Sequence, residues 1–242
     1  MNKLVLHSGG MDSLACMLKY IMNYGSQNII SLGFNYGQRH FKMENEAATR
    51  FCLKHNIVRK VLNVDIAQIG GCSLIDPNKE VTTNMKDQRS TVVPQRNSIF
   101  LLFAAAFAQE NNCDEIVHGA CAEDYEAYRD CRPIFFKLIE KTIQAGRTQP
   151  IKGSEYIYND FCSPGEILPQ NKTDIQISAP LINARKDETV KEIVEKFGIG
   201  VYKDSYTCYN GEDLACGKCP ACQERLNAFK INGLTDPVYY KI

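Results

Sequence analysis

Short apolar runs alternate with longer segments of helical periodicity along most of the chain. Strands are predicted at the apolar runs over residues 3–6, 29–34, 58–66, 115–119 and 175–182. Helices, in which apolar positions recur every three or four residues, are predicted over residues 12–24, 41–55, 97–110, 133–145 and 187–197. Strands that alternate with helices imply right-handed crossover connections. We therefore predict an α/β fold built on a doubly wound parallel sheet.

The loops that follow the predicted strands are the expected place for functional side chains. A parallel sheet binds its ligands beyond the carboxyl ends of its strands, near the switch in strand order. These loops cover residues 8–13, 35–40, 120–132 and 183–186. Residues 148–174 contain prolines and glycines, and they predict a long excursion from the sheet.

Composition and charge narrow the class of protein. A chain of 242 residues, 44% of them apolar, can bury the core of one α/β domain with a small attachment. Twenty-eight basic and 28 acidic residues cancel, so we expect no broad positive surface for a nucleic-acid backbone. No stretch approaches the ~20 apolar residues of a membrane span, and we expect no signal peptide before the strand-like run at residues 3–6. These features predict a cytoplasmic protein without nucleic acid or membrane as a partner; the oligomeric state stays open, with a homodimer among the options.

The string SGGMDS at residues 8–13 joins the first predicted strand to the first predicted helix. Its glycines lack Cβ atoms, so backbone N–H groups can approach an anion closely. The helix N-terminus adds unpaired N–H donors and a partial positive charge. Ser8 and Ser13 supply hydroxyl groups, whereas Asp12 beside a phosphate would hold Mg²⁺ or cap the helix. The two glycines alone fit a plain strand-to-helix turn equally well.

The complete string resembles the PP-loop of ATP pyrophosphatases, which cleave ATP between the α- and β-phosphates and adenylate a substrate. It is not a Walker A loop, because the GK[ST] ending is missing. Lys186 resembles a PP-loop lysine that neutralises departing pyrophosphate, or it is an exposed residue of a first helical turn. The resemblance implies an adenine nucleotide alpha hydrolase-like fold with Mg²⁺ bound alongside ATP. The ATP-binding residues that it implies are His7, Ser8, Gly9, Gly10, Met11, Asp12, Ser13, Leu14 and Lys186.

Four further strings narrow this resemblance. NYGQRH at residues 35–40 follows the second predicted strand, VPQRN at residues 93–97 precedes an apolar helix, and DYEAYRDCR at residues 124–132 follows a later strand. The last string holds the cysteines between residues 208 and 222. Together with SGGMDS they resemble, in this order and over nearly the whole chain, the 7-cyano-7-deazaguanine synthase (QueC) family.

Side chains in these strings offer the groups that a flat, charged heterocycle needs. Arg96 can pair bidentately with a carboxylate or a phosphate, or it can bridge to an acidic surface residue. Asp124 can accept hydrogen bonds from the N–H edge of a guanine-like ring that stacks on Tyr125 and Tyr128. Asp130 and Arg132 can instead pair with each other and hold the loop. The candidate substrate-binding residues are Arg39, His40, Arg96, Asp124, Tyr125, Tyr128, Asp130 and Arg132.

Four of the eleven cysteines are crowded near the C-terminus. Cys208, Cys216, Cys219 and Cys222 have the spacing C-x7-C-x2-C-x2-C. Short gaps let one turn present several thiolates to one ion, and four soft ligands favour a closed, structural Zn²⁺ site. An iron–sulfur cluster is the alternative, but the fourth cysteine of a ferredoxin-type run is absent, and the family resemblance also favours zinc. We predict a PP-loop ATP-binding domain over residues 1–200 and a zinc-bound C-terminal segment over residues 201–242.

The family resemblance implies an ATP-dependent ligase that converts 7-carboxy-7-deazaguanine and ammonia to 7-cyano-7-deazaguanine in queuosine and 7-deazaguanine biosynthesis. It adenylates first the acid and then the amide made from it. A PP-loop tRNA sulfurtransferase, with Cys131 or the terminal cysteines as its reactive group, is one alternative, and a non-catalytic nucleotide-binding zinc scaffold is another. A QueC-like paralogue with a different acceptor is the third. Glu126, Ala127 and Arg129 keep it open, because the family loop usually carries Ser, Gly and Pro there.

Overall fold

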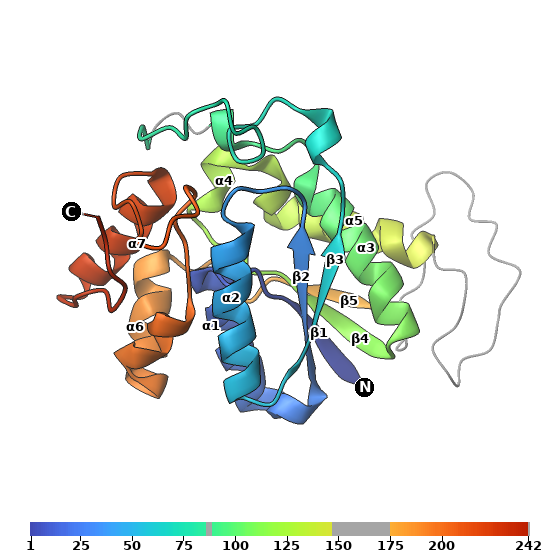
Figure 1. Cartoon of the computed structure of the whole chain (residues 1–242). Coiled ribbons are helices and arrows are strands. Elements are labelled where there is room, and N and C mark those ends of the chain that lie inside the picture. Colours follow the sequence, from blue (N-terminus) through green and yellow to red (C-terminus); the bar gives the residue numbers. More distant parts are fainter. Residues whose placement is uncertain (86–88, 147–174, 242) are drawn as a thin grey trace, which may run out of the picture.

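The computed structural model describes residues 1–85, 89–146 and 175–241, which form a parallel five-stranded sheet with helices on both faces (Figure 1). The strands are β1 (Asn2–Leu6), β2 (Ile29–Asn35), β3 (Val58–Asn63), β4 (Cys113–Val117) and β5 (Gln176–Ser178). They pair in the order β3-β2-β1-β4-β5. The α/β fold expected from the sequence is therefore confirmed, while the excursion predicted at residues 148–174 lies outside the described residues.

Strand β1 lies at the centre of the sheet, where the order of the strands reverses. Leu4 of β1 lies opposite Ile30 of β2 on one side and opposite Ile116 of β4 on the other. β3 and β5 extend the sheet outward from these neighbours. The loop after β1 therefore leaves the sheet at the switch point, where parallel sheets bind their ligands.

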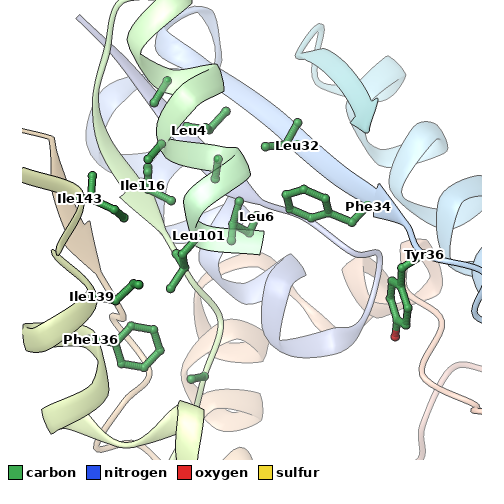
Figure 2. Close-up of a cluster of buried hydrophobic side chains, with 14 of the residues drawn as sticks. Leu4, Leu6, Leu32, Phe34, Tyr36, Leu101, Ile116, Phe136, Ile139 and Ile143 are labelled. Atoms are coloured by element: carbon green, nitrogen blue, oxygen red, sulfur yellow. The ribbon is translucent and has the colours of Figure 1, made fainter. Parts of the chain in front are cut away.

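Helices α3 (Arg96–Glu110) and α5 (Pro133–Ala145) cover one face of the sheet. Figure 2 shows the core beneath them, in which Leu4 of β1 lies together with Leu101 of α3 and Ile139 of α5. All three side chains are buried, so the apolar face of each helix is used against the sheet.

Helices α1 (Met11–Tyr24), α2 (Phe41–Lys54) and α6 (Lys186–Phe197) cover the other face. Val5 follows Leu4 along β1 and belongs to this second core, with Leu14 of α1, because neighbouring side chains on a strand point to opposite faces. The sheet is thus covered on both sides, as the apolar side chains on both faces of its central strands require.

The remaining described elements are short and lie between the main ones. They are α4 (Asp124–Ala127) and the 3-10 helices η1 (Ser26–Asn28), η2 (Ala67–Ile69), η3 (Arg89–Thr91), η4 (Arg129–Cys131) and η5 (Ile199–Asp204). Among the described residues, no helix has both the length and the apolar character of a membrane span.

Two predicted strands are shorter than expected, and one helix was not predicted. The strand predicted over residues 58–66 ends at Asn63, and the one over 175–182 ends at Ser178, shortly before Pro180, which has no N–H for the sheet. Helix α7 (Pro220–Ile231) occupies the C-terminal segment, where we predicted a zinc site but no helix. Its buried face includes the charged Arg225 and the small residues Ala221 and Cys222. No regular stripe of large apolar residues therefore marks this helix in the sequence.

Arg225 anchors α7 to the rest of the molecule. Its Nε and Nη2 donate to the two carboxylate oxygens of Asp236, at 2.6 and 2.9 Å, and both side chains are buried. Nη2 also donates to the carbonyl oxygen of Tyr202, a member of the core that contains α1 and α6. Figure 1 shows α7 beside α6, and η5 runs across the boundary that we predicted at residue 200. The C-terminal segment therefore packs directly on the α/β layers.

Candidate active site and metal centre

A cavity of about 240 Å³ opens at the carboxyl ends of the central strands. Its walls come from the loops after β1, β2 and β4 and from the starts of α3, α6 and α7. Ten of the residues predicted for the ATP and substrate sites line it: Ser8, Gly10, Met11, Asp12, Ser13, His40, Arg96, Asp124, Tyr128 and Lys186. The structure therefore gathers side chains from distant parts of the sequence around one space.

The loop after β1 turns tightly from the strand into α1 and packs closely on α2. Gly9 has φ +105°, and a Cβ atom there would lie 2.2 Å from the carbonyl oxygen of Glu44 on α2. The N–H of Gly10 donates to Ser8 Oγ at 3.1 Å, and the N–H of Gly9 donates to Ser13 Oγ at 3.3 Å. No side chain of the described residues caps the N-terminus of α1, which leaves its first N–H groups available to a ligand.

His7 lies between the end of β1 and this loop, and its side chain does not line the cavity. Its side chain is completely buried, and burial, reinforced by the charge of Arg59, lowers the pKa of His7 to about 3. Arg59 Nη1 donates to the carbonyl oxygen of His7 and to Ser31 Oγ, both at 2.9 Å. Gly9 and Leu14 are also buried behind the cavity wall, so these three predicted ATP residues act on the shape of the loop.

Lys186 is the central cation of the cavity. Its Nζ lies 3.4 Å from Asp12 Oδ2, 3.7 Å from Asp124 Oδ1 and 3.4 Å from Glu224 Oε2. Burial opposes the charge, but the three carboxylates outweigh it, and the pKa of Lys186 stands well above its usual value. Burial raises the pKa of Asp12 to about 6, although Lys186 acts in the opposite direction. A charged lysine thus holds three acidic side chains together beside the loop.

A second group of side chains lies around Arg96. The Arg96 guanidinium carbon lies 5.6 Å from the centre of the Tyr128 ring, and Tyr128 itself is fixed by a 3.0 Å hydrogen bond between its hydroxyl and that of Thr91. His40 Nε2 lies 3.7 Å from Glu44 Oε2. Burial and the nearby charge of Arg96 lower the pKa of His40 to about 4, so this imidazole is neutral at pH 7. The group therefore combines one permanent cation with aromatic surface and uncharged hydrogen-bonding groups.

Four predicted substrate residues do not line the cavity and instead hold its loops. Arg39 donates to the carbonyl oxygens of Asp76 and Lys79, each at 2.7 Å. Tyr125 donates its hydroxyl proton to the carbonyl of Ile182, and Arg132 donates to the carbonyl of Tyr125 at 3.1 Å. Asp130 accepts a 3.1 Å hydrogen bond from the backbone N–H of Asn97. Asp130 therefore ties the 124–132 loop to the start of α3.

Several lining residues were missed from the sequence, among them the polar Glu44, His118, Tyr209 and Glu224. Glu44 follows His40 by one helical turn, so a helix placed over residues 41–55 puts both on one face, and this spacing could have revealed it. Glu224 lies two residues after Cys222 in the helix that was not predicted. Nothing in the sequence pattern indicated that it reaches Lys186.

The four predicted metal-ligand cysteines come together. The sulfur atoms of Cys208, Cys216, Cys219 and Cys222 all lie within 4.8 Å of one another, and those of Cys216 and Cys222 are 3.9 Å apart. Backbone N–H groups donate to this cluster, for example that of Cys219 to Cys216 Sγ at 3.2 Å. Four thiols at this separation could hold a metal ion, since ligands of a tetrahedral Zn–S site, at about 2.3 Å from the ion, lie about 3.8 Å apart.

The four-cysteine cluster adjoins the cavity. Thr207 and Tyr209, on either side of Cys208, line the cavity, as do Ala221 and Glu224 on either side of Cys222. The cysteine cluster therefore positions one wall of the active-site space. Together, these features define an α/β protein that has an uncapped glycine loop at the switch point of its parallel sheet and a cluster of four cysteines beside it.

Comparison with known proteins identifies the family. The family model described as "Queuosine biosynthesis protein QueC" matches residues 2–233, and the chain belongs to this family of enzymes. It is 35% identical to a 7-cyano-7-deazaguanine synthase of Thermoplasma volcanium, over 98% of this chain and 89% of that protein. It is 33% identical to the synthase of Pseudoalteromonas translucida, over 98% of this chain and 97% of that one. The family expected from the five sequence strings is thereby confirmed.

A solved structure, that of a U34-tRNA thiolase from Methanococcus maripaludis with its [4Fe-4S] cluster, is a more distant match. It has a TM-score of 0.47 and 15% identity, over 96% of this chain and 65% of that one.

Proposed function

We propose that this chain converts 7-carboxy-7-deazaguanine and ammonia to 7-cyano-7-deazaguanine at the expense of ATP. Family membership and the names of the curated relatives support the reaction. The structural observation that carries the proposal is that one cavity joins the glycine loop and Lys186 to the Arg96 group. An activating nucleotide and a planar acid can therefore meet in the same space.

The chemistry requires activation because a carboxylate has no acceptable leaving group. Transfer of AMP from ATP to the carboxylate releases pyrophosphate, and ammonia then displaces AMP to give the amide. A second ATP adenylates the amide oxygen, and loss of AMP and a proton leaves the nitrile. The loop N–H groups at residues 8–13 and Lys186 would neutralise the phosphates at each adenylation.

Asp12 is the residue that we expect to hold Mg²⁺ with the triphosphate. One of its oxygens faces Lys186, while Oδ1 has no hydrogen-bond partner among the described residues. A carboxylate oxygen left without a partner beside the phosphate loop fits a hard cation. When bound, Mg²⁺ would supply further neutralisation of phosphate charge.

The predicted substrate residues that line the cavity remain our proposal for holding the acid: His40, Arg96, Asp124 and Tyr128. Arg39, Tyr125, Asp130 and Arg132 would act on the substrate through the loops that they fix. We assign a structural Zn²⁺ to the four cysteines, because sulfurs within 4.8 Å of one another suit a single ion better than a multi-iron cluster.

Sulfur transfer to tRNA is less well supported. That reaction needs a reactive thiolate. Cys131 lines the cavity, but burial and the nearby carboxylates Asp124 and Asp130 raise the pKa of its thiol far above the usual value. A free nucleobase as substrate, without RNA, also agrees with the balanced charge of the chain. We keep a cytoplasmic location and a homodimer as expectations.

The decisive assay supplies 7-carboxy-7-deazaguanine, ATP, Mg²⁺ and ammonium without RNA and detects the nitrile by mass. We expect the nitrile from the unmodified chain and from the control Glu195→Gln, whose side chain is exposed on α6. Asp12→Asn and Ser13→Ala should abolish ATP-dependent product formation. Product that forms equally well in both loop variants, or only when RNA is added, would overturn the proposal.

A further inference from the structure

Glu44 is a carboxyl group inside the cavity that the described residues do not satisfy. Its side chain lines the cavity and is only 15% exposed. The nearest ionisable side chain recorded beside it is His40. The distance from His40 Nε2 to Glu44 Oε2 is 3.7 Å, which is too long for a hydrogen bond. Among the residues that the structure describes, the Glu44 carboxylate accepts no hydrogen bond. Because His40 is neutral at pH 7, no ion pair replaces that bond.

The other three acidic side chains of the cavity are already engaged. Asp12, Asp124 and Glu224 surround Lys186 Nζ. Asp124 also accepts a 3.0 Å hydrogen bond from the backbone N–H of Cys121. Asp124 was the acceptor that the sequence favoured for the N–H edge of the heterocycle, but its capacity is largely used by the protein.

Burial makes the isolated state of Glu44 unfavourable. An ionised carboxylate without partners is strongly disfavoured when it is taken out of water, so such a group either keeps its proton or finds donors. Burial raises the pKa of Glu44 to about 8, although Arg96 and Arg59 act in the opposite direction. Ligand N–H groups would supply the missing donors.

We propose that Glu44 is the specificity-determining acceptor of the substrate site, binding the ring N–H and the adjacent exocyclic amine of a 2-aminopyrimidin-4-one ring. This inference rests on the proposed function and deepens it. Two neighbouring N–H donors match the two oxygens of one carboxylate, and Arg96 then donates to the ring carbonyl oxygen beside them.

The surroundings of Glu44 suit a flat ring in this orientation. Tyr36, Phe100 and Tyr128 line the same cavity, and Phe100 is held by parallel stacking on Phe34, with ring centres 4.3 Å apart. The carboxyl of the substrate sits on the five-membered ring, away from the edge that Glu44 binds. The backbone of Glu44 packs against Gly9, so the acceptor and the phosphate loop are held at a fixed separation.

Binding measurements without ATP test this assignment by calorimetry. The two ligands are 7-carboxy-7-deazaguanine and the matched analogue that lacks the 2-amino group. We expect the unmodified chain to bind the analogue roughly 10- to 100-fold more weakly, the effect of losing one hydrogen bond to a charged group. Glu44→Gln should bind the acid more weakly and lose most of this discrimination, while its affinity for ATP stays unchanged. Glu46→Gln changes an exposed carboxyl on the same helix and is the matched control. It should discriminate between the two ligands as well as the unmodified chain does.

Equal affinity of the unmodified chain for the two ligands overturns the inference without any reliance on a variant. Full discrimination by Glu44→Gln overturns it as well. The nitrile assay separates this failure from failure of the proposed function. If the unmodified chain makes the nitrile while Glu44→Gln still discriminates, only the role of Glu44 is lost. If the unmodified chain neither binds the acid nor makes the nitrile, both proposals fall.

Discussion

Lys186 Nζ lies 3.4 Å from Asp12 Oδ2, which joins the first turn of α6 to the first turn of α1 across the cavity. Both side chains are largely removed from solvent, and the lysine is 5% exposed. This pair is the electrostatic centre of the proposed ATP site, because Asp124 and Glu224 approach the same ammonium group.

Replacement of Lys186 by Met should leave the three acidic side chains without their cation. The pKa of Asp12 should then rise further above 6, since Lys186 is the main influence that lowers it. We expect ATP-dependent pyrophosphate release to fall roughly 100- to 1000-fold, as for removal of one preorganised group that stabilises charge. A coupled phosphate assay measures it. Lys191→Met, an exposed lysine on the same helix, is the control, and equal losses in the two variants would contradict a local role.

Gly9→Ala should destabilise the protein and impair ATP use. The backbone there has φ +105°, and the new Cβ would meet the carbonyl oxygen of Glu44 at 2.2 Å. The strain is about 1–3 kcal/mol for the conformation alone, and the clash with α2 adds to it. Urea unfolding measures the change. Gly200→Ala, where a Cβ would meet nothing within 4 Å, should stay within about 0.5 kcal/mol of the unmodified chain.

Cys219→Ser should remove the bound metal and lower thermal stability. In the proposed zinc site each of the four sulfurs would be one ligand of a closed tetrahedral shell, so a serine oxygen at one position would weaken binding of the metal. Elemental analysis should find zinc in the unmodified chain and in Cys72→Ser, a buried cysteine outside the cluster, and little in Cys219→Ser. Iron with visible absorption in the anaerobically purified protein would rule out the zinc assignment.

His7 should make folding stability fall on the acidic side of pH 6.5. Its pKa is about 3 in the folded protein, so the unfolded chain takes up a proton below 6.5 that the folded chain does not. Between pH 6.5 and 4.5 this contribution amounts to about 2 kcal/mol of lost stability. In His7→Asn the loss over that interval should be smaller by this amount, as urea unfolding at both pH values would show. An identical pH dependence in the two proteins would mean that His7 titrates normally.

Much of the fold followed from local patterns. The helix predicted over residues 133–145 coincides with α5, and the first strand and helix lie within two residues of β1 and α1. These elements have regular apolar spacing and clear ends. Helix α7 was missed because Arg225 occupies its buried face, and that arginine is acceptable there because Asp236 pairs with it and the Tyr202 carbonyl accepts a further hydrogen bond.

Some parts of the candidate site could likewise be predicted from the sequence, and others could not. The loop at residues 8–13 and the four cysteines are recognisable in the sequence because their geometry is local, set by glycines, a helix start and short gaps between ligands. Arg39 and Arg132, in contrast, point to backbone carbonyls and not into the cavity. Which side of a loop a side chain takes depends on neighbours that come from elsewhere in the chain.

The sequence alone determined that this protein has a parallel α/β sheet, a glycine loop before its first helix and a cluster of four thiols. It also indicated the family. Only the tertiary structure decided that Asp12, Lys186 and Glu224 meet, and that Glu44 faces the cavity without a hydrogen-bond partner in the described part of the chain. Backbone preferences and apolar spacing act over a few residues, whereas these contacts depend on strand order and on how α2, α6 and α7 pack around the sheet.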